Sequence, residues 1–307
     1  MTFTPSDLDA IAARLATTGE IDASYSYVGM GATAWDRYVR WQEDGGSPNI
    51  LTSTLSMLRD AHEDLIAPLR GPVRVVDLGP GNGAPVRGVL ERLQAAGRLE
   101  RYVAVDTSPE MLTIAQTNLR SWLGPAAELE FHRRDFASDA LADLRGPATL
   151  VLLTGGTLLN FADPVAVLRH VRQIARVVAF TVRADTVANR IVRFGEDKAD
   201  ARGEAEADLP MRLSAMLDQL GVPREYYEPE FGFDETTRQR YLRVRLTRPA
   251  TVAGRVTLPV GYRVQLLRYL HRSPEELTSM LDAAGYQPLT VHRRADGEFL
   301  LIAGRSA

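Results

Sequence analysis

The feature that most constrains the fold of this chain is an apolar stretch that ends in an acid and runs into three alternating glycines, Val75-Val-Asp77-Leu-Gly79-Pro-Gly81-Asn-Gly83. Glycines at such a turn let the backbone bend tightly and approach a ligand without a clash from Cβ atoms. A helix that follows the turn presents free N–H groups to a negatively charged group such as a carboxylate. Turns that bind dinucleotides usually read G-x-G-x-x-G, whereas this one reads G-x-G-x-G. The difference favours a nucleoside with an amino-acid tail, which has no pyrophosphate to bind.

From residue 73 onward, short β-branched stretches alternate with stretches of helical spacing. The expected strands are 73–78, 102–105, 129–132, 149–153 and 177–182, and the expected helices are 86–96, 164–175 and one that starts at Ser108-Pro109. Near the end of the chain, Ser273-Pro-Glu-Glu276 is a capping box, its helix ends at Gly285, and residues 289–292 and 298–302 form a hairpin. Strands that alternate with helices of ten or more residues predict a parallel, doubly wound α/β sheet.

Other elements are expected outside this alternation. They are helices over 4–17, 52–69 and 198–221 and strands over 230–233 and 240–246. In the last strand Tyr241, Arg243 and Arg245 alternate with three aliphatic residues, so one face is buried and the other is either solvated or directed at a ligand. Solvation is the commoner reason for such a face.

The composition excludes several classes of site. The 307-residue chain has a net charge of −3, and its arginines are spread along the chain and matched by acids, which argues against nucleic-acid binding. The absence of cysteine excludes disulfides, thiolate zinc sites and cysteine nucleophiles. No pair of histidines has metal-ligand spacing, so no metal is expected. No apolar run reaches the ~18 residues of a membrane span and no secretory signal is evident, so we expect no membrane association and a cytoplasmic location.

Acids stand at the ends of three successive predicted strands, Asp77, Asp106 and Asp135. A carboxylate at the position of Asp106 can accept hydrogen bonds from both ribose hydroxyls of a nucleoside. Asp135 could accept a hydrogen bond from an adenine amino group, and Phe136 could supply apolar surface beside it. Because the carboxyl ends of parallel strands meet at one edge of the sheet, these residues predict a single ligand site there.

These motifs resemble the first three motifs of the class I S-adenosylmethionine (SAM)-dependent methyltransferases, matched by Asp77 to Gly83, by Asp106 and by Asp135-Phe136. The resemblance covers roughly residues 70–185 and the terminal helix and hairpin. It implies SAM as cofactor and a Rossmann-like, doubly wound, mostly parallel seven-stranded sheet whose last strand is antiparallel. The residues expected to bind SAM are Asp77, Gly79, Gly81, Gly83, Asp106, Asp135, Phe136 and Thr154.

A closer resemblance links the loop after the fourth strand to the histidine Nα-methyltransferase of ergothioneine biosynthesis. This loop has that enzyme's glycine, small residue and threonine, followed by Asn160-Phe161. Further matches are Tyr27 with Gly31, and Ser273-Pro-Glu-Glu-Leu277. The resemblance covers nearly the whole chain. It implies that Asn160 holds the amino-acid head group of a small-molecule substrate and that Tyr27 lines the same pocket.

The same resemblance implies two domains. Residues 61–185 plus 271–307 are expected to form the SAM-binding methyltransferase core. Residues 1–60 plus 186–270 are expected to form a second, smaller α+β domain that binds substrate or acts as a lid. The chain departs from the family at Leu267 and Tyr269, where the family has a glutamate and a serine that bind the substrate. A pocket that loses a carboxylate in this way should favour a substrate less polar than histidine.

We therefore expect methylation of the amine of an amino acid or an amino-acid-derived metabolite, oriented by Tyr27 and Asn160. No catalytic base is assigned, and His271 is the one histidine near the predicted pocket. Three alternatives stay open at this point. They are an O- or C-methyltransferase of secondary metabolism, a non-catalytic SAM-binding protein and a nicotinamide-dependent oxidoreductase on a similar fold. These motifs do not specify an oligomeric state.

Overall fold

The computed structural model describes residues 3–45, 49–190 and 209–306, and the chain forms two compact units. We call residues 36–189 with 271–307 the core unit, and residues 1–35 with 190–270 the accessory unit. Residues 36–60 and 186–189 were expected in the second domain, whereas both segments belong to the core unit. The reason is that Met57 and Leu58 are buried in the hydrophobic cluster of the core unit, where the Thr54 hydroxyl lies 2.9 Å from that of Thr181.

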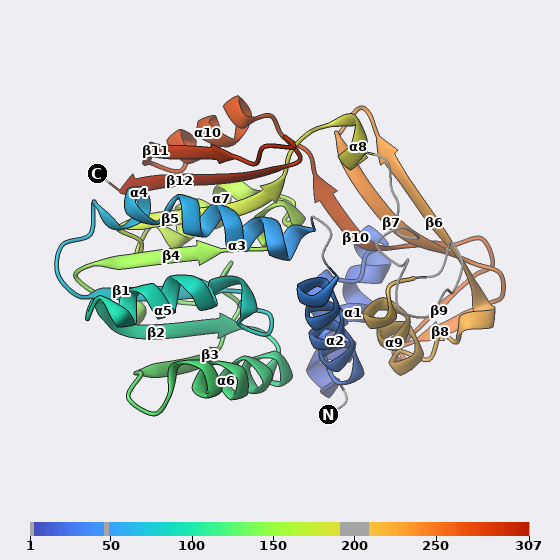
Figure 1. Cartoon of the computed structure of the whole chain (residues 1–307). Helices are drawn as coiled ribbons and strands as arrows, with labels where there is room; N and C mark the ends of the chain where they lie inside the picture. Colours follow the sequence, from blue (N-terminus) through green and yellow to red (C-terminus); the bar gives the residue numbers. More distant parts are fainter. Residues whose placement is uncertain (1–2, 46–48, 191–208, 307) are drawn as a thin grey trace. The chain divides into compact units, whose positions relative to one another are not determined.

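The core unit is built on a seven-stranded sheet in the order β3-β2-β1-β4-β5-β12-β11 (Figure 1). Its strands are β1 (Val73–Leu78), β2 (Leu99–Asp106), β3 (Leu129–Arg133), β4 (Thr149–Leu153), β5 (Val177–Arg183), β11 (Tyr286–Arg293) and β12 (Phe299–Ser306). The pairs among β1 to β5 are parallel, and β12 runs antiparallel to both β5 and β11. This arrangement confirms the predicted Rossmann-like, mostly parallel seven-stranded sheet.

Helices cover both faces of this sheet. The helices of the core unit are α3 (Ile50–Asp60), α4 (His62–Ile66), α5 (Arg87–Ala95), α6 (Pro109–Leu123), α7 (Pro164–Val171) and α10 (Pro274–Ala283), with 3₁₀ turns η2 (Ala84–Val86), η3 (Ala142–Leu144) and η4 (Thr157–Asn160). Helix α8 (Val187–Arg190) begins in the core unit, and its last residue belongs to the accessory unit. Helix α2 (Met30–Asp44) begins in the accessory unit and ends in the core unit. Helices α3, α5 and α6 share one cluster of buried side chains with the sheet. Figure 1 shows these three helices against the sheet. On the other face Leu281 of α10 fills the space that a side chain at Gly304 would need.

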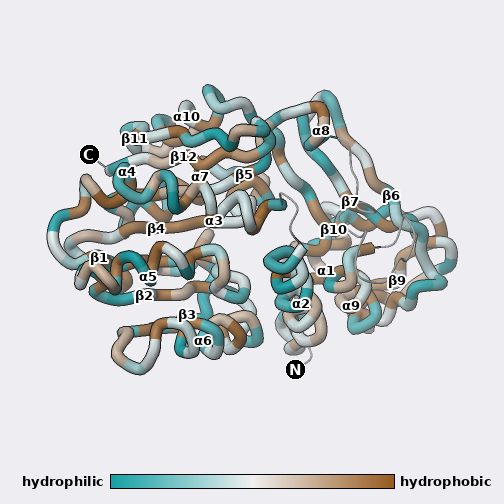
Figure 2. The backbone as a smooth tube through the Cα atoms, in the orientation of Figure 1, coloured by the Kyte–Doolittle hydropathy of each residue, from teal (hydrophilic) through white to brown (hydrophobic). Residues whose placement is uncertain are grey.

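The sequence accounts for these elements through burial and capping. Every residue of β4 is buried, and β4 and β5 are hydrophobic along most of their length (Figure 2). Ser108 caps α6, and Ser273 with Glu276 forms the predicted capping box of α10. The single helix expected over 52–69 is wrong, because the backbone of Ala61 (φ −86°, ψ 1°) separates α3 from α4.

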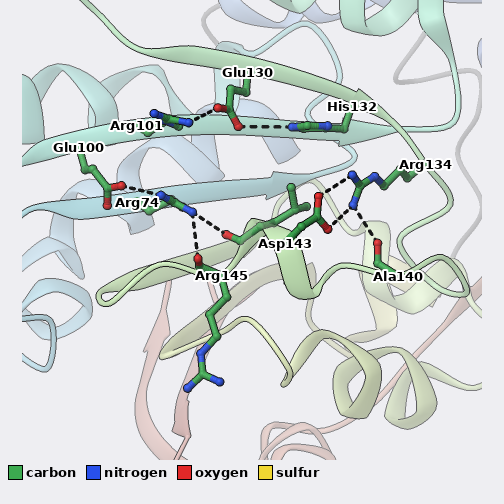
Figure 3. A network of polar contacts seen from close by, with 10 residues as sticks. Arg74, Glu100, Arg101, Glu130, His132, Arg134, Ala140, Asp143 and Arg145 are labelled. Carbon is green, nitrogen blue, oxygen red and sulfur yellow. Dashed lines mark hydrogen bonds and ion pairs between the residues drawn. The ribbon is translucent and has the colours of Figure 1, made fainter.

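Arginine side chains link β1, β2 and the loops of the core unit (Figure 3). The Arg74 guanidinium bonds to Glu100 at 2.6 Å and to the carbonyl oxygens of residues 144 and 145. Arg134 binds both carboxylate oxygens of Asp143 at 2.6 and 2.7 Å, which is the bidentate arrangement that holds geometry best. Because residues 134 and 143 lie at the two ends of the loop after β3, this pair fixes the loop that carries Asp135 and Phe136.

The accessory unit combines two short helices with two small sheets. Its elements are α1 (Pro5–Thr18), α9 (Met211–Gln219), β6 (Tyr227–Asp234), β7 (Gln239–Leu246), β8 (Ala250–Val252), β9 (Val256–Leu258) and β10 (Arg263–Leu270), with 3₁₀ turns η1 (Ala23–Tyr27) and η5 (Arg224–Tyr226). The larger sheet has the order β10-β7-β6, and β8 pairs with β9. Buried residues of α1, α9 and the strands form a second hydrophobic cluster. Thr4 and Asp7 form the predicted capping box of α1.

One prediction for this unit needs correction, and one long strand was not predicted. The helix expected over 198–221 is seen as Met211–Gln219, and its first part, 198–208, lies outside the described residues. Strand β10 was not predicted, because its run of Arg, Gln, Leu and Tyr lacks a simple alternation of polar and apolar residues. No helix in the described parts of the chain is long and apolar enough to cross a membrane.

Candidate cofactor site

The glycine turn after β1 has the backbone that its sequence requires. Gly79, Gly81 and Gly83 have φ values of 73°, 57° and 83°, a region that residues with a side chain rarely adopt. A Cβ on Gly79 would lie 3.3 Å from the Thr157 methyl carbon, and one on Gly83 would lie 3.1 Å from Leu119 Cγ. The turn therefore needs glycine for its conformation and for the close approach of two other segments.

A ring of hydrogen bonds in the core unit holds this turn in place. The buried Asn82 side chain donates to Asp36 at 2.9 Å and accepts from the N–H of residue 84 at 3.1 Å. The Asn118 amide donates to the carbonyl oxygen of Asn82 at 3.0 Å. Arg40 closes the ring by donating to Asn118 and to Asp36, both at 3.0 Å. This ring was not predicted from the sequence, where its only signal is a polar residue between two glycines of the turn.

Asp77 is buried at the end of β1 and lies beneath the glycine turn. The Tyr102 hydroxyl donates to its Oδ2 at 3.0 Å, while Oδ1 has no hydrogen-bond partner in the described residues. Burial raises the pKa of Asp77 to about 7, because the hydrogen bond from Tyr102 does not offset the loss of water and the Asp106 charge raises it further. The site thus contains a buried acid with an oxygen directed at no protein group. Tyr102, the polar group of an otherwise apolar strand segment, was also missed.

Asp106 lies at the end of the neighbouring strand β2, as the sequence analysis expects. Its Oδ1 accepts from the N–H of Ser108 at 2.9 Å, which fixes the orientation of the carboxyl group. Burial raises the pKa of Asp106 to about 6, against the backbone hydrogen bonds of residues 107 and 108 that lower it. The structure therefore brings Asp77 and Asp106 together at one edge of the sheet.

Asp135 and Phe136 occupy the loop after β3 but differ in setting. Asp135 is exposed, and its two oxygens accept from the N–H of residue 137 at 2.9 Å and from the Ser138 hydroxyl at 2.8 Å. Phe136 is buried, with its ring 5.5 Å from the Phe161 ring in an edge-on arrangement, and it also borders Gly79. Phe136 thus lies beside the glycine turn. The Asp135 carboxylate already accepts two hydrogen bonds within its own loop, so it has fewer lone pairs left for a ligand.

The loop after β4 is held by its own hydrogen bonds and by β5. The Thr157 hydroxyl donates to the carbonyl oxygen of the buried Thr154 at 2.8 Å, and the N–H of Gly155 donates to the Thr181 hydroxyl at 2.9 Å. In the described residues the Asn160 side chain, at the end of η4, has no hydrogen-bond partner. Asp163, and not Asn160, caps the next helix. Asn160 is therefore a half-buried amide on a well-fixed loop.

Tyr27 lies in the accessory unit at the end of η1. Its ring is edge-on to Trp35 at 5.5 Å, and the Arg212 guanidinium lies over both rings at 5.3 and 5.4 Å. A cation over two aromatic faces gives this group a fixed geometry. Tyr27 is thus part of an ordered aromatic cluster within its own unit.

Leu267 and Tyr269 lie on β10 just after a bulge. The register shifts between Gln265 and Leu267, so Leu267 pairs with Leu242 on the buried face of the sheet and Tyr269 pairs with Arg240 two positions further along that face. Gln265 pairs with Arg243 on the opposite face. The bulge therefore sets which face each of these side chains occupies.

His271 follows β10 in the core unit. Its side chain is fully buried, and Nδ1 lies 3.7 Å from a carboxylate oxygen of Asp185. Because the ring is fully buried, it does not present a base to a substrate in this structure. In the described residues no group of His, Asp and Glu side chains could hold a metal ion.

The arrangement at the carboxyl ends of β1 and β2 fits SAM. The glycine turn provides backbone without side chains beside a buried acid, and the lone oxygen of Asp77 is suited to the ammonium group of an amino-acid tail. The fixed carboxylate of Asp106 is suited to ribose hydroxyls. No group from the accessory unit is needed for this fit.

Replacing Asp106 with alanine is expected to weaken SAM binding by about 1–3 kcal/mol, or roughly 5- to 150-fold in Kd, because the variant lacks the carboxylate that is expected to accept hydrogen bonds from both ribose hydroxyls. Isothermal titration with S-adenosylhomocysteine measures this change. Glu110, four residues further on at the start of α6, serves as a control when it is replaced with alanine. An unchanged Kd in the Asp106 variant would show that Asp106 does not bind the ribose.

Comparison with known proteins places the chain in a family. A family model described as histidine-specific, SAM-dependent methyltransferase matches residues 10–306. A SAM-dependent methyltransferase of Clostridium acetobutylicum has a similar structure, with a TM-score of 0.52, 11% identity and coverage of 89% of this chain and 98% of its own. The magnesium protoporphyrin IX methyltransferase of Synechocystis, solved with bound SAH, has a TM-score of 0.50 and 11% identity. The match covers 92% of this chain and 96% of that protein.

At this identity the structural similarity shows the fold alone. Among curated proteins none has a matching sequence. The family match decides between the methyltransferase and the nicotinamide-dependent oxidoreductase in favour of the former, and it makes SAM the cofactor. The chain belongs to the family of histidine-specific, SAM-dependent methyltransferases.

Proposed function

We propose that this methyltransferase acts on the amine of a small amino acid or amino-acid-derived metabolite that is less polar than histidine. The observation that carries the proposal is the Asn160 amide, which has no hydrogen-bond partner in the described residues and lies on the loop after β4. An amide group both donates and accepts hydrogen bonds. It therefore suits a head group that carries an amine and a carboxylate together.

The composition of this loop favours an amine over a hydroxyl as the group that is methylated. Residues 154–161 contain no titratable side chain. An amine reacts once it is unprotonated, whereas a hydroxyl is helped by a general base, which is worth ~10²–10⁴-fold. His271 does not offer such a base, because its ring is fully buried beside Asp185.

Most of the rate acceleration is assigned to orientation. SAM supplies an electrophilic methyl group bonded to a sulfonium. When the methyl group is transferred, the sulfur becomes a neutral thioether. The glycine turn, Asp77 and Asp106 would hold the donor, and Asn160 would orient the acceptor amine. Fixing two reactants in this way is worth ~7–11 kcal/mol. The ring of Asp36, Asn82, Asn118 and Arg40 holds the turn in place. The turn would therefore fix the position of the donor before the acceptor binds.

The accessory unit is proposed to determine which side chain the substrate carries. Leu267 offers no carboxylate to pair with an imidazole, and Tyr269 keeps only a neutral hydroxyl. Tyr27, held between Trp35 and Arg212, would contribute an aromatic surface with a hydroxyl. These three positions favour an apolar or aromatic side chain over imidazole.

Replacing Asn160 with alanine is expected to lower kcat/KM for the accepted amino acid about tenfold, with little change in the Kd for S-adenosylhomocysteine, because a hydrogen bond to the acceptor is lost. Turnover is measured as S-adenosylhomocysteine formed on a panel of amino acids and their methyl esters, hydroxy-acid analogues and biogenic amines. Asp163→Ala removes the cap of α7, three residues away, and should leave kcat/KM unchanged. Equal losses of turnover and of donor binding in the Asn160 variant would contradict the proposed role.

The same panel separates the alternatives. Methylation of hydroxy acids in preference to amino acids would assign the chain to O-methylation. Binding of SAM without turnover on any amine would support a non-catalytic SAM-binding protein. Faster turnover of histidine than of leucine, phenylalanine or tyrosine would contradict the proposed preference for a less polar side chain.

A further inference from the structure

A polar pocket lies within the accessory unit, on the face of the three-stranded sheet opposite its hydrophobic cluster. Its volume is about 300 Å³, and it is lined by Thr18, Gly19, Glu20, Gln239, Arg243, Arg263 and Gln265. Leu242, Val244 and Leu246 of β7 point into the hydrophobic cluster, so Arg243 between them lies on the other face. Pockets of this size are at the lower end of those that bind small molecules.

The charges around this pocket are paired, with one exception. Arg263 donates to Glu230 at 2.8 Å, and Arg245 pairs with Glu228 and Glu230. Glu20 pairs with Arg14 at 3.2 Å and with Arg268. Arg243 has no carboxylate within ion-pair distance in the described residues. The pocket therefore contains a half-buried cation that forms no direct ion pair in the described part of the chain, although Asp234 is near enough to feel its charge and Glu230, its cross-strand partner, is paired with Arg263 and Arg245.

The Arg243 side chain is nevertheless held in a fixed position. Its Nε donates to Gln265 Oε1 at 2.8 Å, and its guanidinium lies 4.1 Å from the centre of the Tyr241 ring. The two terminal nitrogens of Arg243 make no hydrogen bond to a described residue. The Gln239 amide, also at the pocket, has none either. A planar guanidinium that is fixed at Nε and on one face presents two parallel N–H groups to a ligand.

We propose that this pocket binds a small oxyanion, with two oxygens of one carboxylate or phosphoryl group on the terminal nitrogens of Arg243 and a further polar atom on Gln239. The site is distinct from the proposed substrate contacts, because the bulge in β10 puts Leu267 and Tyr269 on the other face of the sheet from Gln265. It is also independent of the cofactor residues, all of which belong to the core unit. The accessory unit would thus bind a second ligand besides any substrate.

Citrate and inorganic phosphate are the probes, titrated separately into the full-length protein saturated with S-adenosylhomocysteine. Isothermal titration is expected to show binding of at least one of them. Arg243→Gln should weaken it at least tenfold, and Arg243→Lys should weaken it in part, because an ammonium keeps the charge but loses the planar pair of donors. Tighter citrate binding assigns the site to carboxylates, and tighter phosphate binding assigns it to phosphoryl groups.

Arg245→Gln is the matched control, because this neighbour on the same face is already paired with two glutamates. It should leave the anion affinity unchanged. Each variant should bind S-adenosylhomocysteine like the parent, which shows that it is folded. No binding of either anion up to about 10 mM, or an equal loss in the Arg243 and Arg245 variants, would overturn the proposal.

Discussion

Replacing Asp77 with asparagine is expected to remove about 4 kcal/mol of pH dependence from the stability of the SAM-free protein. The carboxyl of Asp77 is buried, and its pKa in the folded protein is about 7 against 3.8 for an ordinary aspartate. Each pH unit over which only the unfolded chain is ionised is worth about 1.4 kcal/mol. The interval from 3.8 to about 7 therefore corresponds to about 4 kcal/mol.

The direction of this effect follows from which state holds the proton. Between the two pKa values the folded protein keeps the Asp77 proton and the unfolded chain has lost it, so the free energy of unfolding falls as the pH rises. Below pH 4 both states are protonated, and above pH 7 both are ionised, so the contribution is constant there. Asp106, with a pKa of about 6, adds a change of the same sign. Asparagine does not titrate, and the Asp77 contribution disappears.

The measurement is urea unfolding of both proteins from about pH 4 to about pH 8. The parent is expected to lose stability relative to the variant across this range, and the difference between the two curves removes the other titrating groups. Asp282→Asn, at an exposed position of α10, should run parallel to the parent. Parallel curves for the parent and the Asp77 variant would show that folding does not raise the pKa of Asp77, and would contradict this prediction. The variant should also bind SAM more weakly, because it lacks a carboxylate for the ammonium group.

Replacing Gly31 with alanine is expected to destabilise the protein by about 3 kcal/mol or more, because the added Cβ overlaps backbone. That Cβ would overlap the carbonyl oxygen of Ser26 and lie 2.9 Å from its carbonyl carbon. A backbone group cannot rotate away as a long side chain can, so η1 and the start of α2 must separate. Tyr27 lies at the end of η1, and its packing against Trp35 should be lost as well.

Gly88 provides the matched comparison for this change. It also lies in a helix, but the nearest described atom to a Cβ added there is the terminal nitrogen of Arg92 at 3.5 Å, an ordinary contact with the end of a flexible side chain. Gly88→Ala should stabilise the protein by up to ~1 kcal/mol, the usual preference of a helix for alanine. Thermal unfolding followed by circular dichroism measures both variants. If the Gly31 variant unfolded at the parent's temperature, η1 would not be packed against α2 as described.

The fold could be predicted from the sequence where the local residues allow few conformations, as in the glycine turn and the buried apolar strands. Asp77 to Gly83 and the buried strands 73–78 and 149–153 have one reasonable arrangement, and the structure confirms the strands with these bounds. The capping boxes at Thr4 and Ser273 are local interactions over three residues, so they are visible in the sequence.

The parts that could not be predicted depend on contacts between distant residues. Asn82 meets Asp36 across 46 positions, and Arg40 meets Asn118 across 78, so no local pattern indicates the ring around the glycine turn. The boundary of the accessory unit could not be predicted for the same reason. Only the packing of Met57 and Leu58 in the hydrophobic cluster of the core unit shows that α3 belongs to that unit. The bulge in β10 shifts every later side chain to the other face, and a single extra residue has no sequence signature.

The central claim is that the glycine turn after β1, with Asp77 beneath it and Asp106 at the end of the next strand, forms the SAM site. A crystal structure of the full-length protein with S-adenosylhomocysteine tests it most directly. We expect the amino-acid tail at residues 79–83, its ammonium group on Asp77 and both ribose hydroxyls on Asp106. Density for the adenosine at any other edge of the sheet, with Asp106 free of ligand, would contradict the account.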